Sequence, residues 1–207
     1  MKAAFLAASA AMLMAGSAQA ATTIAGFTFT STATSLIESS GIYTTQGGPL
    51  ATVLTDSDAG TYAVSTDPAA FLRLGFASGI LNGAGDDFVV FTLGSFAQFD
   101  ADPVSVTVNG VQIKRSPVST GTFSGGPAFA NLNAAAFDLS EFGLGTGSSI
   151  SEIRIGNRVA PPLISFVGVL NTAVVPEPST WMLMIMGFGL IAQQLRRRHR
   201  GVAQVAA

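Results

Sequence analysis

The 207-residue chain has no cysteine and only one histidine, His199, which lies close to the C-terminus. The missing cysteines exclude a disulfide scaffold, thiol catalysis and cysteine-ligated zinc. The position of the lone histidine excludes Ser-His-Asp triads and HExxH metalloprotease sites within the folded part. Charged residues are also scarce, at 11% of the chain against about 25% in an average soluble domain. These absences argue against an ordinary cytosolic enzyme.

The few charges that are present are mostly negative in the middle of the chain. The formal net charge of the whole chain is -2, but residues 21–175 hold eleven acidic and five basic residues, a net charge of -6. An acidic, weakly charged domain opposes binding to nucleic acid or to an anionic membrane. It is compatible with cations or neutral glycans as partners.

The first 20 residues have the three parts of a secretory signal peptide. Lys2 supplies the positive start, residues 3–16 are apolar and uncharged, and Ala18 and Ala20 frame a small-x-small cleavage site. We expect signal peptidase to cut after Ala20. The alternative, an uncleaved membrane anchor, is disfavoured by the short apolar run and by the cleavage site.

A second ordered set of features begins near residue 174. Pro176 and Pro178 fix their own φ and push the preceding residues into extended backbone, so residues 175–178 are predicted to form a stiff strip. Such a strip suits the groove of a protease, and Glu177 is its charged handle. Trp181 then stands where an interfacial aromatic belongs, ahead of an apolar run that is followed by an arginine cluster.

The length of the apolar run decides how the tail is interpreted. Residues 181–192 span about 18 Å as a helix, and extension to residue 195 gives about 22 Å, still short of a bilayer core of roughly 30 Å. Length alone favours a buried or interfacial helix. The flanking arginines can snorkel and let the bilayer thin locally. We therefore predict a short N-out, C-in transmembrane helix, with the arginines on the cytoplasmic side.

The order of strip, apolar run and arginine cluster resembles a PEP-CTERM sorting signal, the carboxyl-terminal address of exported proteins in Gram-negative bacteria. The resemblance implies processing by exosortase, an integral-membrane enzyme, near the Pro-Glu-Pro element, and association with extracellular polysaccharide and biofilm matrix. It assigns exosortase recognition to four residues, Pro176, Glu177, Pro178 and Trp181. The positive-inside rule makes the arginine cluster the cytoplasmic membrane stop, at Arg196, Arg197, Arg198 and Arg200. Gln193 and Gln194 depart from the pattern, where small apolar residues are usual, and His199 interrupts the basic run.

The middle of the chain has β-type patterning. Runs of alternating or continuous apolar residues predict strands at 24–30, 70–76, 88–93, 104–108, 111–114, 150–155 and 163–170. Asn109-Gly110 between two of them is typical of a type I′ hairpin turn, and residues 138–142 predict one short turn of helix. We expect an all-β ectodomain at 21–173, an antiparallel, jelly-roll-like β-sandwich with phenylalanines filling the gap between its sheets. It lies between a signal peptide at 1–20, a sorting signal at 174–200 and a tail at 201–207.

Two acidic loops are weak candidates for Ca²⁺ binding. Their oxygen-bearing residues are Asp56 and Asp58 in one loop and Asn82, Asp86 and Asp87 in the other. Ca²⁺ prefers six to eight oxygen ligands from such loops, but neither loop has EF-hand spacing. Asp and Gly in loops more often form turns. No other metal or cofactor is expected.

A glycoside hydrolase is the enzymatic alternative, with carboxylate pairs at Asp86/Asp87 or Asp100/Asp102. The absence of an activated nucleophile pattern disfavours it. We therefore expect a non-enzymatic protein of the cell envelope or extracellular matrix, with a Ca²⁺- or carbohydrate-binding surface module as the alternative. Its expected partners are signal peptidase, exosortase, the membrane and exopolysaccharide, but not nucleic acid. It would be anchored in the inner membrane on the periplasmic side before processing, and found at the cell surface or outside the cell afterwards.

Overall fold

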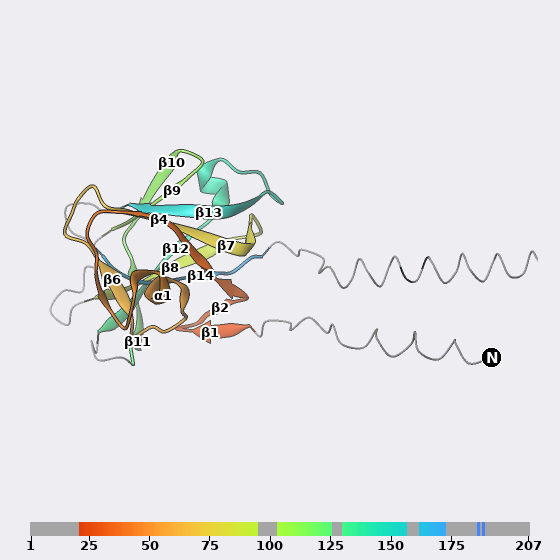
Figure 1. The fold of residues 1–207 in the computed structure, drawn as a ribbon. Helices are drawn as coiled ribbons and strands as arrows, with labels where there is room; N and C mark the ends of the chain where they lie inside the picture. The colour runs from red at the N-terminus through yellow and green to blue at the C-terminus, as the bar shows by residue number, and fades with distance from the viewer. Residues whose placement is uncertain are drawn as a thin grey trace, which may run out of the picture. The chain divides into compact units, whose positions relative to one another are not determined.

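The computed structural model describes residues 21–94, 103–125, 130–156 and 162–172, together with Met186 and Phe188 (Figure 1). The four continuous ranges all belong to a unit formed by residues 19–173, and the two single residues belong to a second unit. Met186 and Phe188 have helical backbone and exposed side chains. Within the described ranges, no helix combines the length and the apolar character that a membrane crossing requires. The predicted signal peptide and the rest of the predicted C-terminal helix lie outside these ranges.

The regular secondary structure of the described β domain is almost entirely antiparallel strand, as the sequence predicted. Helical structure there is confined to α1 (Leu50–Thr55) and one 3-10 turn, η1 (Leu139–Phe142). The strands are β1 (Thr22–Ile24), β2 (Phe27–Phe29), β3 (Ser31–Thr32), β4 (Ser35–Ser40), β5 (Thr44–Gln46), β6 (Tyr62–Val64), β7 (Phe71–Leu81), β8 (Phe88–Gly94), β9 (Val104–Val108), β10 (Val111–Arg115), β11 (Val118–Phe123), β12 (Asn131–Phe137), β13 (Ser149–Gly156) and β14 (Leu163–Val169).

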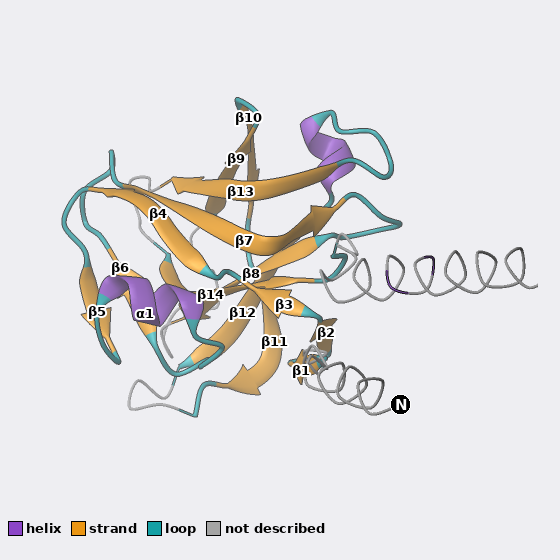
Figure 2. Cartoon of the chain, turned by 45° about the vertical axis from the view of Figure 1, so that its right-hand side comes forward, coloured by secondary structure: helices purple, strands orange, loops and turns teal. Residues whose placement is uncertain are grey.

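These strands form two large sheets and one small one. The five-stranded sheet has the order β10-β9-β13-β7-β4, and the seven-stranded sheet has the order β11-β12-β8-β14-β6-β5, with β3 also paired to β14. Figure 2 shows β4, β7 and β13 of the first sheet above β8, β12 and β14 of the second. The third sheet is the isolated hairpin β1-β2.

The main core draws side chains from both large sheets. Alternation along β9 turns Val104, Val106 and Val108 inward. They join apolar residues of β7 and β13 from their own sheet and of β8, β12 and β14 from the other, together with α1 and η1. One continuous apolar cluster therefore holds the two sheets together.

A second apolar cluster lies on the seven-stranded sheet. All seven residues of β8 are buried, so this strand is covered on both faces, as its continuous apolar run indicates. Val89 and Phe91 of β8 belong to the second cluster with Phe29 of the β1-β2 hairpin and Phe166 of β14. The expectation that the phenylalanines would fill the gap between the sheets was therefore only partly right. Phe88 and Phe137 lie in the main core, whereas Phe29, Phe91 and Phe166 form the second cluster.

The local patterns predicted turns better than they predicted polar strands. Asn109 and Gly110 have φ values of 48° and 83° and join β9 to β10 with Val108 opposite Val111, as a type I′ turn requires. The single strand expected at 24–30 is wrong, because Ala25 and Gly26 adopt positive φ and fold this segment into the β1-β2 hairpin. Six strands were not predicted from the sequence, and their side chains include many Ser, Thr, Ala and Asn: β3, β4, β5, β6, β11 and β12.

Candidate functional site

The residues assigned to export and sorting lie outside the described ranges. They comprise the cleavage-site residues Ala18 and Ala20, the recognition residues Pro176, Glu177, Pro178 and Trp181, and the membrane-stop residues Arg196, Arg197, Arg198 and Arg200. The described β domain ends at Thr172, two positions before the expected sorting signal. Residues 162–172 are therefore the described segment that lies just before this signal in the sequence.

A buried carboxylate holds that end of the domain. The Asp87 side chain is 0% exposed, and its Oδ1 accepts hydrogen bonds from the Asn171 side-chain amide and from the Gly83 backbone N–H, both at 2.8 Å. Its Oδ2 accepts the backbone N–H of Leu139, also at 2.8 Å. One local N–H donor and two donors from distant parts of the chain thus meet at one carboxylate, which offsets the cost of burying it. We call this cluster the Asp87 clasp.

The backbone around the Asp87 clasp is bonded in the same way. The Asp87 carbonyl accepts the N–H groups of Leu170 at 2.8 Å and Asn171 at 3.3 Å, and the Asn171 carbonyl accepts the N–H of Leu81 at 2.8 Å. The Thr30 hydroxyl donates to the Thr172 hydroxyl at 3.2 Å. The last described residues before the sorting signal are therefore tied to the ends of β7 and β8.

The first candidate Ca²⁺ loop is occupied by its own turn bonds. Asp56 Oδ1 accepts the Asp58 N–H at 3.2 Å and the Thr61 hydroxyl at 3.1 Å, while Asp58 Oδ1 accepts the Gly60 N–H at 2.8 Å. Partial burial raises the pKa of Asp56, against the lowering effect of the bonds from Asp58 and Thr61. These contacts match the turn-forming alternative.

The second candidate loop does not gather its oxygens at one point. Asn82 is buried and donates its amide to the Leu144 carbonyl at 2.8 Å, and Asp87 belongs to the clasp. The Oδ1 atom of Asp86 instead lies 3.8 Å from Nη1 of Arg115. No group of three His, Cys, Asp or Glu side chains suited to a metal occurs among the described residues. Calcium binding stays a prediction, without a preformed cluster in this part of the chain.

Of the two carboxylate pairs considered for glycoside hydrolysis, the structure describes one. Asp86 is exposed but the adjacent Asp87 is completely buried, so these two carboxylates do not face one open space. Asp100 and Asp102 lie in the gap between residues 94 and 103 and are not described.

Arg115 connects the two large sheets. From the end of β10 its Nη2 donates to both Glu141 carboxylate oxygens at 2.6 and 2.7 Å, and its Nη1 donates to the Ala136 carbonyl of β12. The guanidinium also lies over the Phe137 ring, 5.3 Å from its centroid. The fork geometry of arginine allows one side chain to make all these contacts.

A groove of about 320 Å³ runs beside Arg115. It is bounded by Phe27 of the β1-β2 hairpin and by Val118 of β11, and β12 contributes Ala134 and Ala136. Ser116, Ser119 and Thr120 add three hydroxyl groups. The groove thus combines small apolar residues with hydroxyl groups and with a cation whose charge is compensated by Glu141.

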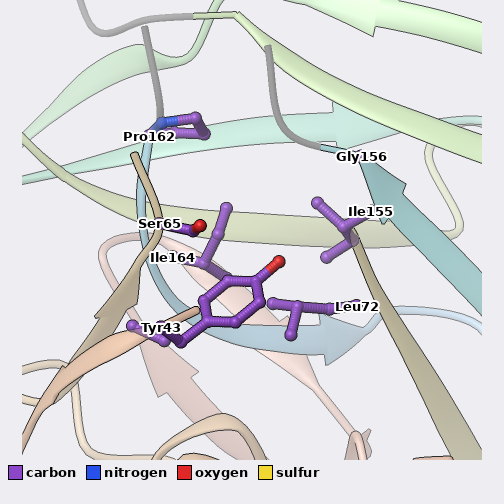
Figure 3. Close-up of a pocket in the computed structure, with 8 residues that line it drawn as sticks. Tyr43, Ser65, Leu72, Ile155, Gly156, Pro162 and Ile164 are labelled. Atoms are coloured by element: carbon purple, nitrogen blue, oxygen red, sulfur yellow. The ribbon is translucent and has the colours of Figure 1, made fainter. Parts of the chain in front are cut away.

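A smaller pocket lies where β5 and β6 approach β7 and β13. Its lining includes Tyr43, Leu72, Ile155 and Ile164, and its volume of about 10 Å³ suffices for roughly one water molecule. Figure 3 shows the Tyr43 ring among these side chains, with its hydroxyl pointing toward Ile155. Burial, with a smaller effect of the negative charge on Asp67, raises the pKa of Tyr43 to about 12. The Tyr43 phenol is therefore neutral at physiological pH. With a volume of about 10 Å³, the pocket is too small for a substrate.

The roles of Asn171, Arg115 and Tyr43 were not predicted from the sequence. Asn171 gave no signal, because nothing in its neighbours indicates a partner 84 positions away. Arg115 had a weak one, since an arginine at the end of an edge strand can reach carbonyl groups and acids of another sheet.

Comparison with known proteins identifies the tail. A family model, described as the PEP-CTERM protein-sorting motif, matches residues 174–200. No curated protein matches the chain.

Among solved structures, the chain is similar to the crystal structure of SpGH29, with 17% identity, a TM-score of 0.34, and coverage of 63% of this chain and 27% of that one. It is also similar to the catalytic unit of the thermostable GH87 alpha-1,3-glucanase from Streptomyces thermodiastaticus strain HF3-3, with 12% identity, a TM-score of 0.37, and coverage of 72% of this chain and 28% of that one. The chain thus matches only about a quarter of the length of either protein. The match to the family model is what identifies a feature of this protein: the chain carries a PEP-CTERM sorting motif at residues 174–200.

Proposed function

We propose that this protein is a non-enzymatic component of the cell envelope or extracellular polysaccharide matrix, delivered there by exosortase. The observation that carries the proposal is the sorting motif at residues 174–200, which directly follows the unit formed by residues 19–173. An exosortase-sorted, exported protein is what this motif implies, and the matrix role extends that implication.

The steps of delivery follow from the order of the segments. Signal peptidase removes residues 1–20 after export, the apolar run from Trp181 holds the chain in the inner membrane, and the arginines stay on the cytoplasmic side. Exosortase then cuts near Pro176–Pro178 and releases the β domain to the cell surface.

The β domain itself is suited to a structural or binding role. We infer that its two large sheets form a jelly-roll-like sandwich, because both contribute to one apolar core. The non-enzymatic assignment is supported by the use of Asp87, a candidate catalytic acid, as the acceptor of three N–H groups inside the fold.

The termini of the mature protein test the delivery proposal. Mass spectrometry of the extracellular form is expected to find an N-terminus at Ala21 and a C-terminus near residues 176–178. Glu177→Gln and Pro178→Ala should each leave the intact chain in the membrane fraction. The control is Pro103→Ala, which replaces an exposed proline of the β domain and should be processed normally. An intact tail on the extracellular wild-type protein would contradict the proposal.

A second candidate function, binding of a neutral glycan, is favoured by the groove beside Arg115. Three hydroxyl-bearing residues and the half-buried Phe27 ring line a space of about 320 Å³, within the range of small-ligand sites at roughly 300–1,000 Å³. The Arg115 charge is compensated by Glu141, so the groove has no strong preference for an anion.

This candidate is tested by retention of the protein on exopolysaccharide from the producing cells. Ser116→Trp would place a large side chain at the exposed wall of the groove and should abolish retention. Lys114→Trp, also exposed on β10 but outside the groove lining, is the matched control. Equal retention of both variants and the wild type would remove the groove as the binding site.

A further inference from the structure

The chain contains two Asn-Gly pairs that differ in exposure and in hydrogen bonding. One pair is Asn109-Gly110, in the turn between β9 and β10, and the other is Asn82-Gly83, between β7 and β8. Deamidation begins when the backbone nitrogen of the glycine attacks the side-chain carbonyl carbon of the asparagine. A glycine in the following position favours this attack, because it has no side chain to block the nitrogen.

The turn pair is open to this attack. Asn109 and Gly110 are both exposed, and a Cβ built on Gly110 would meet no atom within 4 Å. Within the described part of the chain, the Asn109 amide and the Gly110 N–H have no hydrogen-bond partner. Both the nitrogen that attacks and the amide that departs are therefore available.

The other pair is blocked at the same two groups. The Asn82 side chain is 2% exposed, and its amide nitrogen donates to the Leu144 carbonyl at 2.8 Å. The Gly83 N–H donates to Asp87 Oδ1 at 2.8 Å, and a Cβ on Gly83 would lie only 2.6 Å from the Asn171 amide nitrogen. Reaction there requires the Asp87 clasp to open first.

We propose that Asn109 is a site of deamidation and isoaspartate formation in the folded protein. The Gly110 nitrogen loses its proton and bonds to Asn109 Cγ, ammonia leaves, and a five-membered succinimide remains. Water then opens this ring. Attack on the side-chain carbonyl gives aspartate, and attack on the main-chain carbonyl gives isoaspartate, so that one amide and one water become one carboxylic acid and one ammonia.

The position in the fold gives the modification a structural consequence. Isoaspartate adds one carbon to the main chain of a two-residue turn whose register sets Val108 opposite Val111. Among the described strands, β10 lies at the edge of its sheet and pairs only with β9, so no second described strand pairs with it. Its last residue is Arg115, which connects the two sheets. Deamidation therefore adds a negative charge and loosens the strand that positions Arg115.

The purified full-length chain tests the proposal through the relative rates at the two pairs. After incubation at mildly alkaline pH, peptide mapping should find conversion at Asn109 faster than at Asn82 by more than about tenfold, because Asn82 reacts only after local opening. Isoaspartate in the Asn109 peptide is identified by an isoaspartyl methyltransferase. In denaturant, where both pairs lose their surroundings, the two rates should converge.

A matched variant confirms the assignment of the signal. Asn109→Gly keeps a residue that accepts positive φ in a type I′ turn but removes the amide, so it should lose the fast conversion while the slow one at Asn82 is unchanged. Equal rates at the two pairs in the folded chain would overturn the proposal. So would the absence of conversion at Asn109 in the folded chain together with rapid conversion in denaturant.

Discussion

The side-chain amide of Asn171 donates a hydrogen bond to the buried Oδ1 of Asp87 at 2.8 Å, across 84 positions of sequence. The sorting motif begins three residues after Asn171. This bond, with the backbone bonds beside it, holds the β domain together up to the residues that precede the motif. The mature protein would therefore keep its closing contacts after removal of the tail.

The Asp87 clasp predicts a large difference between two adjacent carboxylates. Asp87→Asn replaces one oxygen by an NH₂ group, which then faces an N–H donor in either orientation. We expect unfolding to become easier by about 1–3 kcal/mol. Asp86→Asn, on an exposed side chain paired to Arg115 at 3.8 Å, should cost at most about 1 kcal/mol. Urea denaturation of the two variants measures both values, and equal losses would mean that the clasp does not hold the domain end.

The contacts of Arg115 predict that charge alone cannot replace it. Arg115→Ala should lower stability by about 1–3 kcal/mol, because the Ala136 carbonyl and Glu141 lose their donor. Arg115→Lys should recover only part of this, since an ammonium cannot form the same fork. Lys114→Ala, at the exposed neighbouring position, is expected to change stability by less than about 0.5 kcal/mol. A full recovery by lysine in thermal denaturation would contradict this explanation.

The β1-β2 hairpin is predicted to be held by its phenylalanines. Phe29 is fully buried and contacts Phe166 with ring centroids 5.7 Å apart, while Phe27 meets Phe91 edge-on at the same distance. Phe29→Ala should cost about 3–5 kcal/mol and the half-buried Phe27→Ala about 1–3 kcal/mol.

Hydrogen exchange provides the local measurement for the hairpin. In Phe27→Ala, loss of protection should be confined to β1 and β2, because these two strands pair with no other described strand. Val118→Ala, at a side chain that is 72% exposed, is the control and should leave exchange unchanged. Loss of protection throughout β8 in Phe27→Ala would show instead that the hairpin is part of the main cooperative unit.

Tyr43 predicts a specific loss of stability at high pH. Its pKa is about 12 in the folded chain and about 10 in the unfolded chain. A raised pKa means that the folded state keeps the proton more tightly, so the contribution to stability is complete below pH 10 and is lost as the pH rises toward 12.

The comparison between the wild type and Tyr43→Phe isolates this effect. Melting temperatures measured from neutral to strongly alkaline pH should show a steeper decline for the wild type than for the variant over this window. Parallel curves would mean that Tyr43 ionises equally well in both states.

Local sequence patterns were sufficient for the features that depend on neighbouring residues. The alternation in residues 104–108 and the Asn109-Gly110 pair determined the β9-β10 hairpin, because a two-residue turn with positive φ has few solutions. The apolar run of β8 determined a strand buried on both faces. The sorting motif was recognised from a contiguous order of residues and was confirmed by the family model.

The polar strands could not be predicted in the same way. β4 and β11 are mostly exposed edge strands, so their residues show little of the apolar alternation that marks a strand. They are strands because backbone groups of β7 and β12 pair with them. Such pairing depends on neighbours far away in sequence.

The sequence by itself thus determined the all-β class, the hairpin turn and the address at the C-terminus, since each rests on residues a few positions apart. Only the tertiary structure decided which acids are available to a ligand. Asp86 and Asp87 look alike in the sequence, but folding places one in solvent and surrounds the other with three N–H donors. The physical reason is that burial and hydrogen bonding of a carboxylate depend on groups that only the completed fold brings together.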